Sequence, residues 1–112
     1  MGCNSLGAEG AKQLSKNISW VNLQELNLEY NSIDRKGTAF LSENNSWFNL
    51  QALNLANNSV GAEGARELGK NTTWANLQTL DLTGNLIRVE GARELRKNVS
   101  WVNLQVLKLA NS

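Results

Sequence analysis

Residues 50–60 read LQALNLANNSV, and this stretch decides the fold because close copies of it recur along the chain. Residues 23–33 read LQELNLEYNSI, residues 77–87 read LQTLDLTGNLI, and residues 104–112 read LQVLKLANS. Leucines alternate with other residues in each copy, a period of two that is typical of a short strand with one buried face. The sequence therefore predicts four strands, at Gln24–Leu28, Gln51–Leu55, Gln78–Leu82 and Gln105–Leu109.

The whole chain follows the same period. The four tryptophans, Trp20, Trp47, Trp74 and Trp101, are each 27 residues apart, and the glycines Gly10, Gly37, Gly64 and Gly91 repeat with the same spacing. Between the strands, stretches such as 62–70 (AEGARELGK) combine helix-forming residues with apolar residues at helical spacing. We expect one domain over residues 1–112, divided into strand-plus-helix units at 1–22, 23–49, 50–76 and 77–103 and a partial unit at 104–112.

These motifs resemble the leucine-rich-repeat family, and in particular its ribonuclease-inhibitor-like subclass. The strand motifs quoted above carry the resemblance, together with the helical segments GTAFL, GAEGAREL and EGAREL that follow them. The resemblance implies an α/β fold, a leucine-rich-repeat solenoid in the form of a horseshoe arc. It would have a parallel sheet on its concave side and helices on its convex side. We expect four coils without caps, which is a departure from the family pattern. The resemblance also implies a protein that acts by protein–protein contact.

Composition narrows the function further. Eleven basic and ten acidic residues give a net charge of +1, unlike the strongly basic balance of nucleic-acid-binding proteins. No apolar run has the length of a membrane span, and the first residues do not form a signal peptide. The single cysteine and the absence of a leader favour a reducing, cytoplasmic location. Histidine, the commonest general base and metal ligand, is absent, so we expect no enzyme activity, metal or cofactor.

Several repeated residues are interpreted as scaffold. We expect the tryptophans to form a core ladder rather than an aromatic platform for ligands, and the glycines to permit close helix packing. Within the helices, Glu63 with Arg66 and Glu90 with Arg93 are expected to form exposed ion pairs. One asparagine column is expected to turn inward and bond the backbone between coils: Asn4, Asn31, Asn58 and Asn85. A second column follows the helices and is expected to cap them in the left-handed conformation: Asn17, Asn44, Asn71 and Asn98.

Asn-x-Ser/Thr sequences, which are glycan acceptors in secreted proteins, are interpreted as by-products of this repeat pattern. They begin at Asn17, Asn44, Asn57, Asn71 and Asn98.

The candidate binding face consists of the residues that alternate with the strand leucines and therefore point to the concave side. Tyr30 is the best single anchor, because tyrosine is enriched in binding hot spots. Glu25 and Glu29 make the first coil acidic, opposite Lys108 in the last. The candidate residues are Glu25, Asn27, Glu29, Tyr30, Asn54, Asn57, Thr79, Asp81, Thr83 and Lys108.

Two function classes remain open from the sequence. The first is a non-catalytic protein-interaction module, a segment of a longer array, whose protein partner is not identified. The second is a repeat fragment that associates with itself through uncapped terminal coils, because an unpaired strand edge invites pairing. A designed consensus array is a further alternative, although the divergent stretch IDRKGTAFLSENNSWF at residues 33–48 favours a natural sequence.

Overall fold

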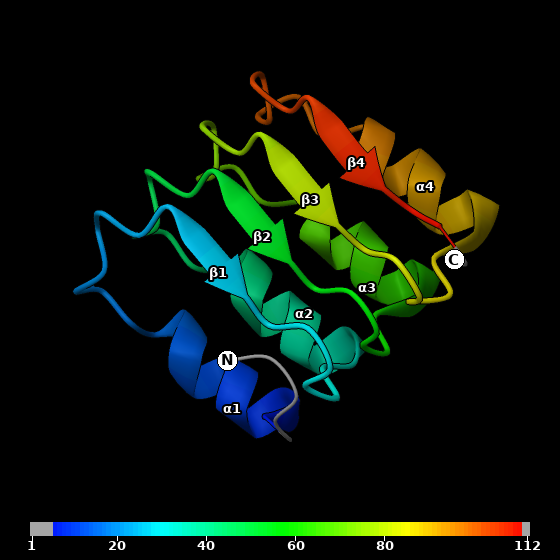
Figure 1. The fold of residues 1–112 in the computed structure, drawn as a ribbon, viewed down its shortest axis with the longest axis horizontal. Helices are drawn as coiled ribbons and strands as arrows, with labels where there is room; N and C mark the ends of the chain where they lie inside the picture. The colour runs from blue at the N-terminus through cyan, green and yellow to red at the C-terminus, as the bar shows by residue number, and fades with distance from the viewer. Residues whose placement is uncertain (1–5, 111–112) are drawn as a thin grey trace.

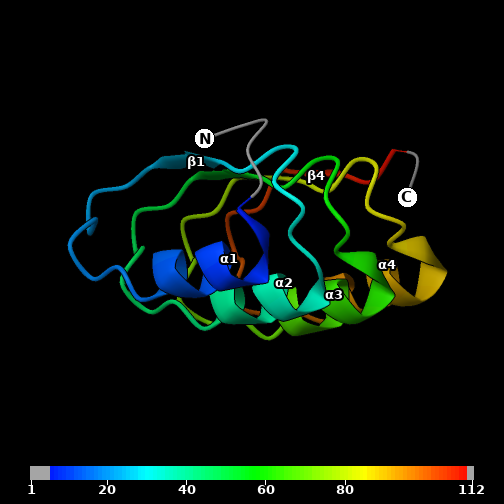
Figure 2. The same ribbon diagram turned by 90° about the horizontal axis from the view of Figure 1, so that it is seen from below.

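A computed structural model describes residues 6–110 of the protein. Helices and strands alternate along these residues, and Figure 1 shows the strands side by side in one layer. In Figure 2 the helices form a second layer beneath the sheet. The helices are α1 (Gly7–Ser15), α2 (Arg35–Ser42), α3 (Gly61–Leu68) and α4 (Arg88–Arg96). The strands are β1 (Glu25–Asn27), β2 (Ala52–Asn54), β3 (Thr79–Asp81) and β4 (Val106–Lys108).

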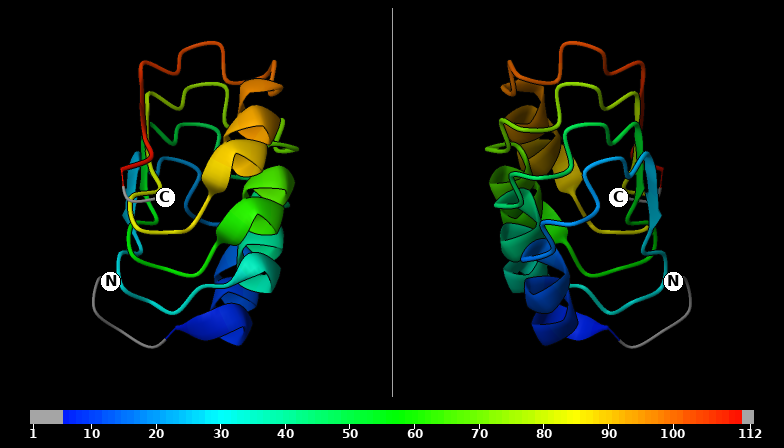
Figure 3. Two further views of the ribbon diagram at one scale, coloured as in Figure 1. Left: turned by 90° about the vertical axis from the view of Figure 1, so that its right-hand side faces the viewer. Right: turned by 90° about the vertical axis from the view of Figure 1, so that its left-hand side faces the viewer.

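The strands form one parallel sheet in the order β1-β2-β3-β4. Each residue pairs with the residue one repeat further on, as Leu26 does with Leu53. Strands of three residues are shorter than the five residues expected from the sequence. Backbone hydrogen bonds nevertheless continue past both ends, from Gln51 N to Gln24 O at 2.7 Å and from Tyr30 N to Ala56 O at 3.1 Å. The fold is therefore the expected solenoid, and Figure 3 shows its coils one above another, with the strands on one side and the helices on the other.

The strand leucines and the tryptophans fill the space between sheet and helices. Leu53, Leu80, Trp47 and Trp74 are at most 1% exposed. The rings of Trp47 and Trp74 stack with their centroids 6.3 Å apart and their planes 16° from parallel. The core ladder is thus confirmed for the later coils. Trp20 departs from it, because it is 43% exposed in the first coil.

The repeated glycines bring adjacent helices together, as expected. A Cβ at Gly91 would lie 3.1 Å from Ala62 Cα in the preceding helix, and also 2.6 Å from Cγ2 of Ile87. Contacts this short leave no room for a side chain. The glycine column therefore sets how closely one coil approaches the next.

The inner asparagine column joins successive coils, also as expected. Asn58 Oδ1 accepts hydrogen bonds from the backbone N–H groups of Asn31 and Ile33, both at 2.9 Å. Its Nδ2 donates to the carbonyl oxygens of Leu28 and Leu55, both at 2.9 Å. Asn85 makes equivalent bonds one coil later. One buried side chain thus satisfies backbone groups of two coils; Asn4 lies outside the described residues.

The second asparagine column does not behave as expected. None of Asn17, Asn44, Asn71 and Asn98 is among the described residues with positive φ, so they are not left-handed helix caps. Instead, Asn71 Oδ1 accepts from the backbone N–H of Thr73 at 3.0 Å and of Trp74 at 2.9 Å. Its Nδ2 donates to Ser42 O at 2.9 Å. This column therefore fixes the turn that follows each helix and ties it to the coil before.

The expected pairs within helices are also wrong. In residues 6–110 the ion pairs join Arg35 to Glu63, Lys70 to Glu67 and Lys97 to Glu94. Arg35 reaches across from α2 to α3, so Glu63 faces the neighbouring helix rather than Arg66. All three pairs are substantially exposed and contribute little stability.

Candidate functional site: the concave face

We call the outward face of the sheet, with the turns that follow its strands, the concave face. Six of the ten candidate residues lie in the strands and four in these turns. The strand register sets Glu25, Ala52, Thr79 and Val106 in one row, and Asn27, Asn54, Asp81 and Lys108 in a second. Every candidate side chain is exposed or half-buried. The parallel sheet thus brings residues from four coils onto one surface, as the alternation of leucines predicts.

The candidates divide into two groups along the strands. A shallow depression of about 250 Å³ lies over the strands themselves. Beyond the carboxyl ends of the strands lie Glu29, Tyr30, Asn57 and Thr83. The depression is lined by the remaining candidates, Glu25, Asn27, Asn54, Thr79, Asp81 and Lys108, with Leu26, Ala52 and Leu53.

Three of the candidates also have a structural role. Asn27 Oδ1 accepts from Glu29 N, Asn54 Oδ1 from Ala56 N, and Asp81 Oδ1 from Thr83 N, at 2.9–3.0 Å. These are Asx turns, which short amide and carboxylate side chains form readily. The preference for Asn or Asp in this row therefore reflects the turn after each strand, a reason that the sequence analysis missed.

Tyr30 occupies an unusual backbone position. Tyr30 and Asn57 each have a φ of 57°, and Gly84, in the same row, has a φ of 71°. The left-handed conformation favours glycine and asparagine, so variation in this row follows the backbone as well as any ligand. Tyr30 does not follow this preference, because a bulky side chain is disfavoured in the left-handed conformation. Its side chain is 53% exposed, so little burial offsets that cost.

The electrostatics of the concave face are asymmetric. Three carboxylates, on Glu25, Glu29 and Asp81, stand against the one amine of Lys108 among the described residues of these rows. Ala52 and Ala56 place small side chains next to the acidic first coil, and Ala56 is 3% exposed. The small side chains of the second coil therefore leave the surface recessed beside Tyr30. The paired alanines at 52 and 56 were the sequence signal for it, and the sequence analysis did not include them.

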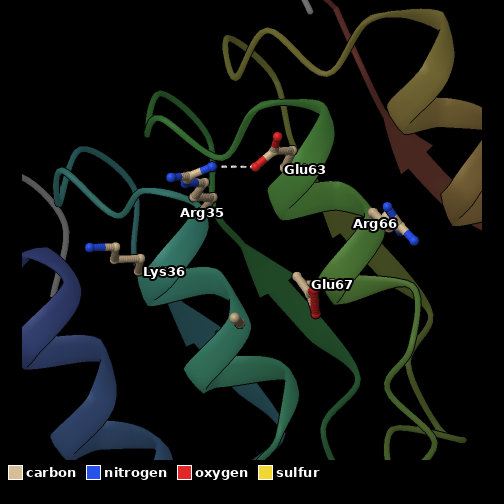
Figure 4. Close-up of a pocket in the computed structure, with 6 residues that line it drawn as sticks. Arg35, Lys36, Glu63, Arg66 and Glu67 are labelled. Atoms are coloured by element: carbon tan, nitrogen blue, oxygen red, sulfur yellow. Dashed lines mark hydrogen bonds and ion pairs between the residues drawn. The ribbon is translucent and has the colours of Figure 1, made fainter.

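The helix side offers a different kind of groove. Arg35, Lys36, Ala39, Glu63, Arg66 and Glu67 line a hollow between α2 and α3. Arg35 and Glu63 point toward each other and form the ion pair, while Lys36 and Arg66 point to opposite sides (Figure 4). The hydrogen bond to Glu63 raises the pKa of Arg35, which stays charged. Because these charges pair or diverge, they do not converge on a common ligand position.

The structure separates the Asn-x-Ser/Thr sequences into two groups. Asn44 and Asn71 are buried, at 3% and 2% exposure, and both amides donate hydrogen bonds. A glycan attached at either position would have to displace the turn. Asn17, Asn57 and Asn98 are half-buried. Burial of two of the five supports the interpretation that the motif arises from the repeat.

Residues 6–110 contain neither a metal-binding cluster nor a membrane-spanning helix. No cluster of three or more His, Cys, Asp or Glu side chains is arranged to hold a metal ion. No helix in that range combines the length and the apolar character needed to span a bilayer.

The fold and the concave face together define a class, a solenoid of strand-plus-helix coils held by buried leucines and an asparagine ladder. Family models described as Leucine Rich repeat match residues 22–45, 48–69 and 75–95. The chain therefore belongs to the leucine-rich-repeat proteins. Such repeats typically mediate protein–protein interaction and serve as non-enzymatic scaffolds. Comparison with curated protein sequences gave no match.

Proposed function

We propose that this protein is a protein-interaction module whose concave face binds a basic segment of a protein partner. The observation that carries the proposal is Tyr30, an aromatic side chain held 53% exposed at a left-handed φ of 57°. Other coils place asparagine or glycine in that row. A residue kept in a disfavoured conformation with its ring exposed is a common feature of binding sites.

The charges of the concave face suggest the chemistry of the partner. Glu25 and Glu29 lie on the same strand and turn as Tyr30, and Asp81 lies two coils further on. A lysine or arginine of the partner would contact these carboxylates, and an arginine would also stack on the tyrosine ring. Lys108 at the far end disfavours a uniformly basic ligand. The proposed ligand is therefore a segment with one or two basic residues near one end.

The rigidity of the sheet supports this role. The row of Asx turns and the inner asparagine column fix the backbone on which the candidate side chains stand. A surface ordered before binding loses little conformational entropy when the partner arrives. Hence a few contacts are enough for a useful affinity.

We also assign the protein to the ribonuclease-inhibitor-like subclass of the family. The 27-residue unit and a helix of eight or nine residues in every described coil support this assignment. Subclasses with shorter repeats have less room for a helix between strands.

A selection from a random peptide display library tests the proposed function. The chain would be compared with a variant in which Glu25, Tyr30, Asp81 and Lys108 are all serine. A matched control replaces Glu9, Lys36, Arg66 and Glu90 on the helix side with serine. The proposal expects enriched peptides that contain lysine or arginine, bound by the wild type and the control and lost by the concave-face variant. Equal binding by all three proteins would contradict it.

A second candidate function is self-association through the terminal coils, and one observation favours it. Trp20 is 43% exposed, whereas Trp47 and Trp74 in the same column are fully buried. Another coil placed against the first would bury this ring and the half-buried Leu23. Substitution of Trp20 by serine would then lower the mass at high concentration, and an unchanged mass would argue against this candidate.

A further inference from the structure

A row of exposed apolar side chains runs along one edge of the molecule, outside the concave face. Each loop from a helix to the next strand carries one such residue directly after the tryptophan: Val21, Phe48, Ala75 and Val102. Phe48 is 55% exposed and Val102 is 75% exposed. In Figure 1 these loops follow one another along the edge where the strands begin. We call this row the apolar edge row.

The loops that carry the row are free of charge. Residues 17–24, 44–51, 71–78 and 98–105 contain no acidic or basic residue, although charged residues make up 19% of the chain. Ile18 and Val99, at 73% and 87% exposure, extend the apolar surface at its two ends. Exposed apolar side chains that recur in successive uncharged loops are a candidate interaction site.

The backbone under the row is held rigidly. Asn49 Nδ2 donates to Val21 O, Asn76 Nδ2 to Phe48 O, and Asn103 Nδ2 to Ala75 O, each at 2.9 Å. The side-chain amide of each coil thus fixes the row residue of the coil before. The backbone that carries Val21, Phe48 and Ala75 is therefore held in place, which lowers the backbone entropy lost on association.

We infer that the apolar edge row binds the same row of a second copy of this protein, in reversed coil order, to form a two-fold dimer. In that arrangement the first coil faces the fourth and the second faces the third. Phe48 of each copy then meets the small Ala75 of the other, and Val21 meets Val102. A large side chain thus opposes a small one at both central contacts, and valines of equal size oppose each other at the ends of the row. In parallel order, Phe48 would meet Phe48 and Ala75 would leave a gap.

Charge supports a second copy as the occupant. An uncharged strip can approach its own copy without repulsion. At the start of the same loops, reversed order brings Glu43 opposite Lys70 of the other copy, twice in the dimer. Lys16 would face Lys97. Lys70 and Lys97 already pair with Glu67 and Glu94 of their own chain, at 3.2 Å and 2.9 Å, which weakens both the attraction to Glu43 and the repulsion from Lys16. The support from charge is therefore the uncharged strip itself.

The size of the contact determines how the dimer would behave. Four strands about 4.8 Å apart give a row roughly 15 Å long, so the contact buries much less area than a standard specific interface. The association is therefore weak and reversible. It closes at two copies, unlike stacking through terminal coils, which is open-ended.

Sedimentation equilibrium of the whole chain from about 5 μM to 1 mM tests this inference. We expect the average mass to rise from 12.3 kDa toward twice that value and no further. Phe48→Asp would hold the chain at the monomer mass. Leu86→Asp is the matched control, because Leu86 is 62% exposed and lies outside the row.

Two further variants separate the inferred pairing from general stickiness. Ala75→Phe sets phenylalanine against phenylalanine and weakens the dimer at least tenfold, whereas non-specific association would increase with the added ring. The double variant Phe48→Ala with Ala75→Phe exchanges the two partners and restores dimerisation. Circular dichroism checks that each variant folds. A monomer at 1 mM, a mass beyond the dimer, or stronger association of Ala75→Phe would overturn the inference.

Discussion

At the scale of the residue, the structural role of a side chain cannot be predicted from its residue type alone. The side chain of Asn58 makes hydrogen bonds with five backbone groups of two coils, whereas Asn45 is exposed and lies outside both asparagine columns. The same amide is therefore part of the interior in one position and solvated in another. Position in the 27-residue unit, rather than residue type, determines the role.

Removal of the inner amide is expected to destabilise the fold. Asn58→Ala leaves the N–H groups of Asn31 and Ile33 buried without their acceptor. We expect a loss of about 3 kcal/mol in the free energy of unfolding, because each orphaned buried group costs about 1–3 kcal/mol. Urea denaturation measures it. Asn45→Ala serves as the control, with an effect of about 0.5 kcal/mol or less. Equal losses of stability in the two variants would contradict the structural role of the inner asparagine column.

Tyr30 should show a conflict between stability and binding. Tyr30→Asn places a residue that tolerates the left-handed conformation where tyrosine does not. We expect the free energy of unfolding to rise by about 0.5–1 kcal/mol, because relief of the strained backbone exceeds the lost contacts of an exposed ring. Tyr30→Phe should leave stability unchanged. A clear destabilisation by Tyr30→Asn would show that the ring supports the fold instead.

The pair of Glu94 and Lys97 predicts a small acid dependence. The hydrogen bond from Lys97, at 2.9 Å, lowers the pKa of Glu94 below its ordinary 4.5. A carboxyl whose pKa is lowered by folding stabilises the fold above its unfolded pKa, and this contribution is lost as the pH falls through the lowered value. Lys97→Met should raise the pKa of Glu94 toward 4.5 in an NMR titration. An unchanged pKa would exclude the pair in solution.

At the scale of the element, helix spacing depends on glycine. Gly91 lies against Ala62 of the preceding helix, whereas the three atoms nearest to a Cβ at Gly10 all belong to the side chain of Leu6. Both residues occupy the same place in the repeat. The difference arises because α1 has no helix before it among the described residues.

These two glycines make a matched pair for substitution. Gly91→Ala should lower the free energy of unfolding by about 1–2 kcal/mol, because overpacking between helices exceeds the gain in helix propensity. Gly10→Ala should be neutral or stabilising by up to about 1 kcal/mol, since Leu6 can move aside. Thermal melts of both variants measure the difference. Equal destabilisation by the two variants would show that the repeated glycines do not act by setting the distance between helices.

The element scale also shows what the sequence could not predict. The helix starts differ: Gly7, Gly61 and Arg88 have positive φ, while Asp34 caps α2 by accepting from Gly37 N at 2.9 Å. The repeat pattern predicts the same helix start in every coil and therefore does not reveal these differences. Likewise, the pairing of Arg35 with Glu63 depends on the angle between two helices, which spacing within one helix does not contain.

At the scale of the whole molecule, most of the fold was predicted from the 27-residue repeat. Leucine, tryptophan and glycine columns gave the parallel sheet, its register and the core, because a repeated unit must stack on its copies. The same alternation predicted the outward position of the six candidates that lie in the strands. The other four follow the strands in turns, where a period of two no longer applies. The alternation did not separate binding from backbone: the Asx turns at Asn27, Asn54 and Asp81 appear only when hydrogen bonds are known.

The central claim is that the concave face is the binding surface. Chemical-shift mapping of the 15N-labelled chain, titrated with a peptide from the display selection, tests it most directly. We expect the largest shifts at Glu25, Tyr30, Ala56 and Thr79, with Glu63, Arg66 and Phe48 unaffected. Shifts concentrated on the helices or on the apolar edge row would contradict the claim and move the binding surface elsewhere.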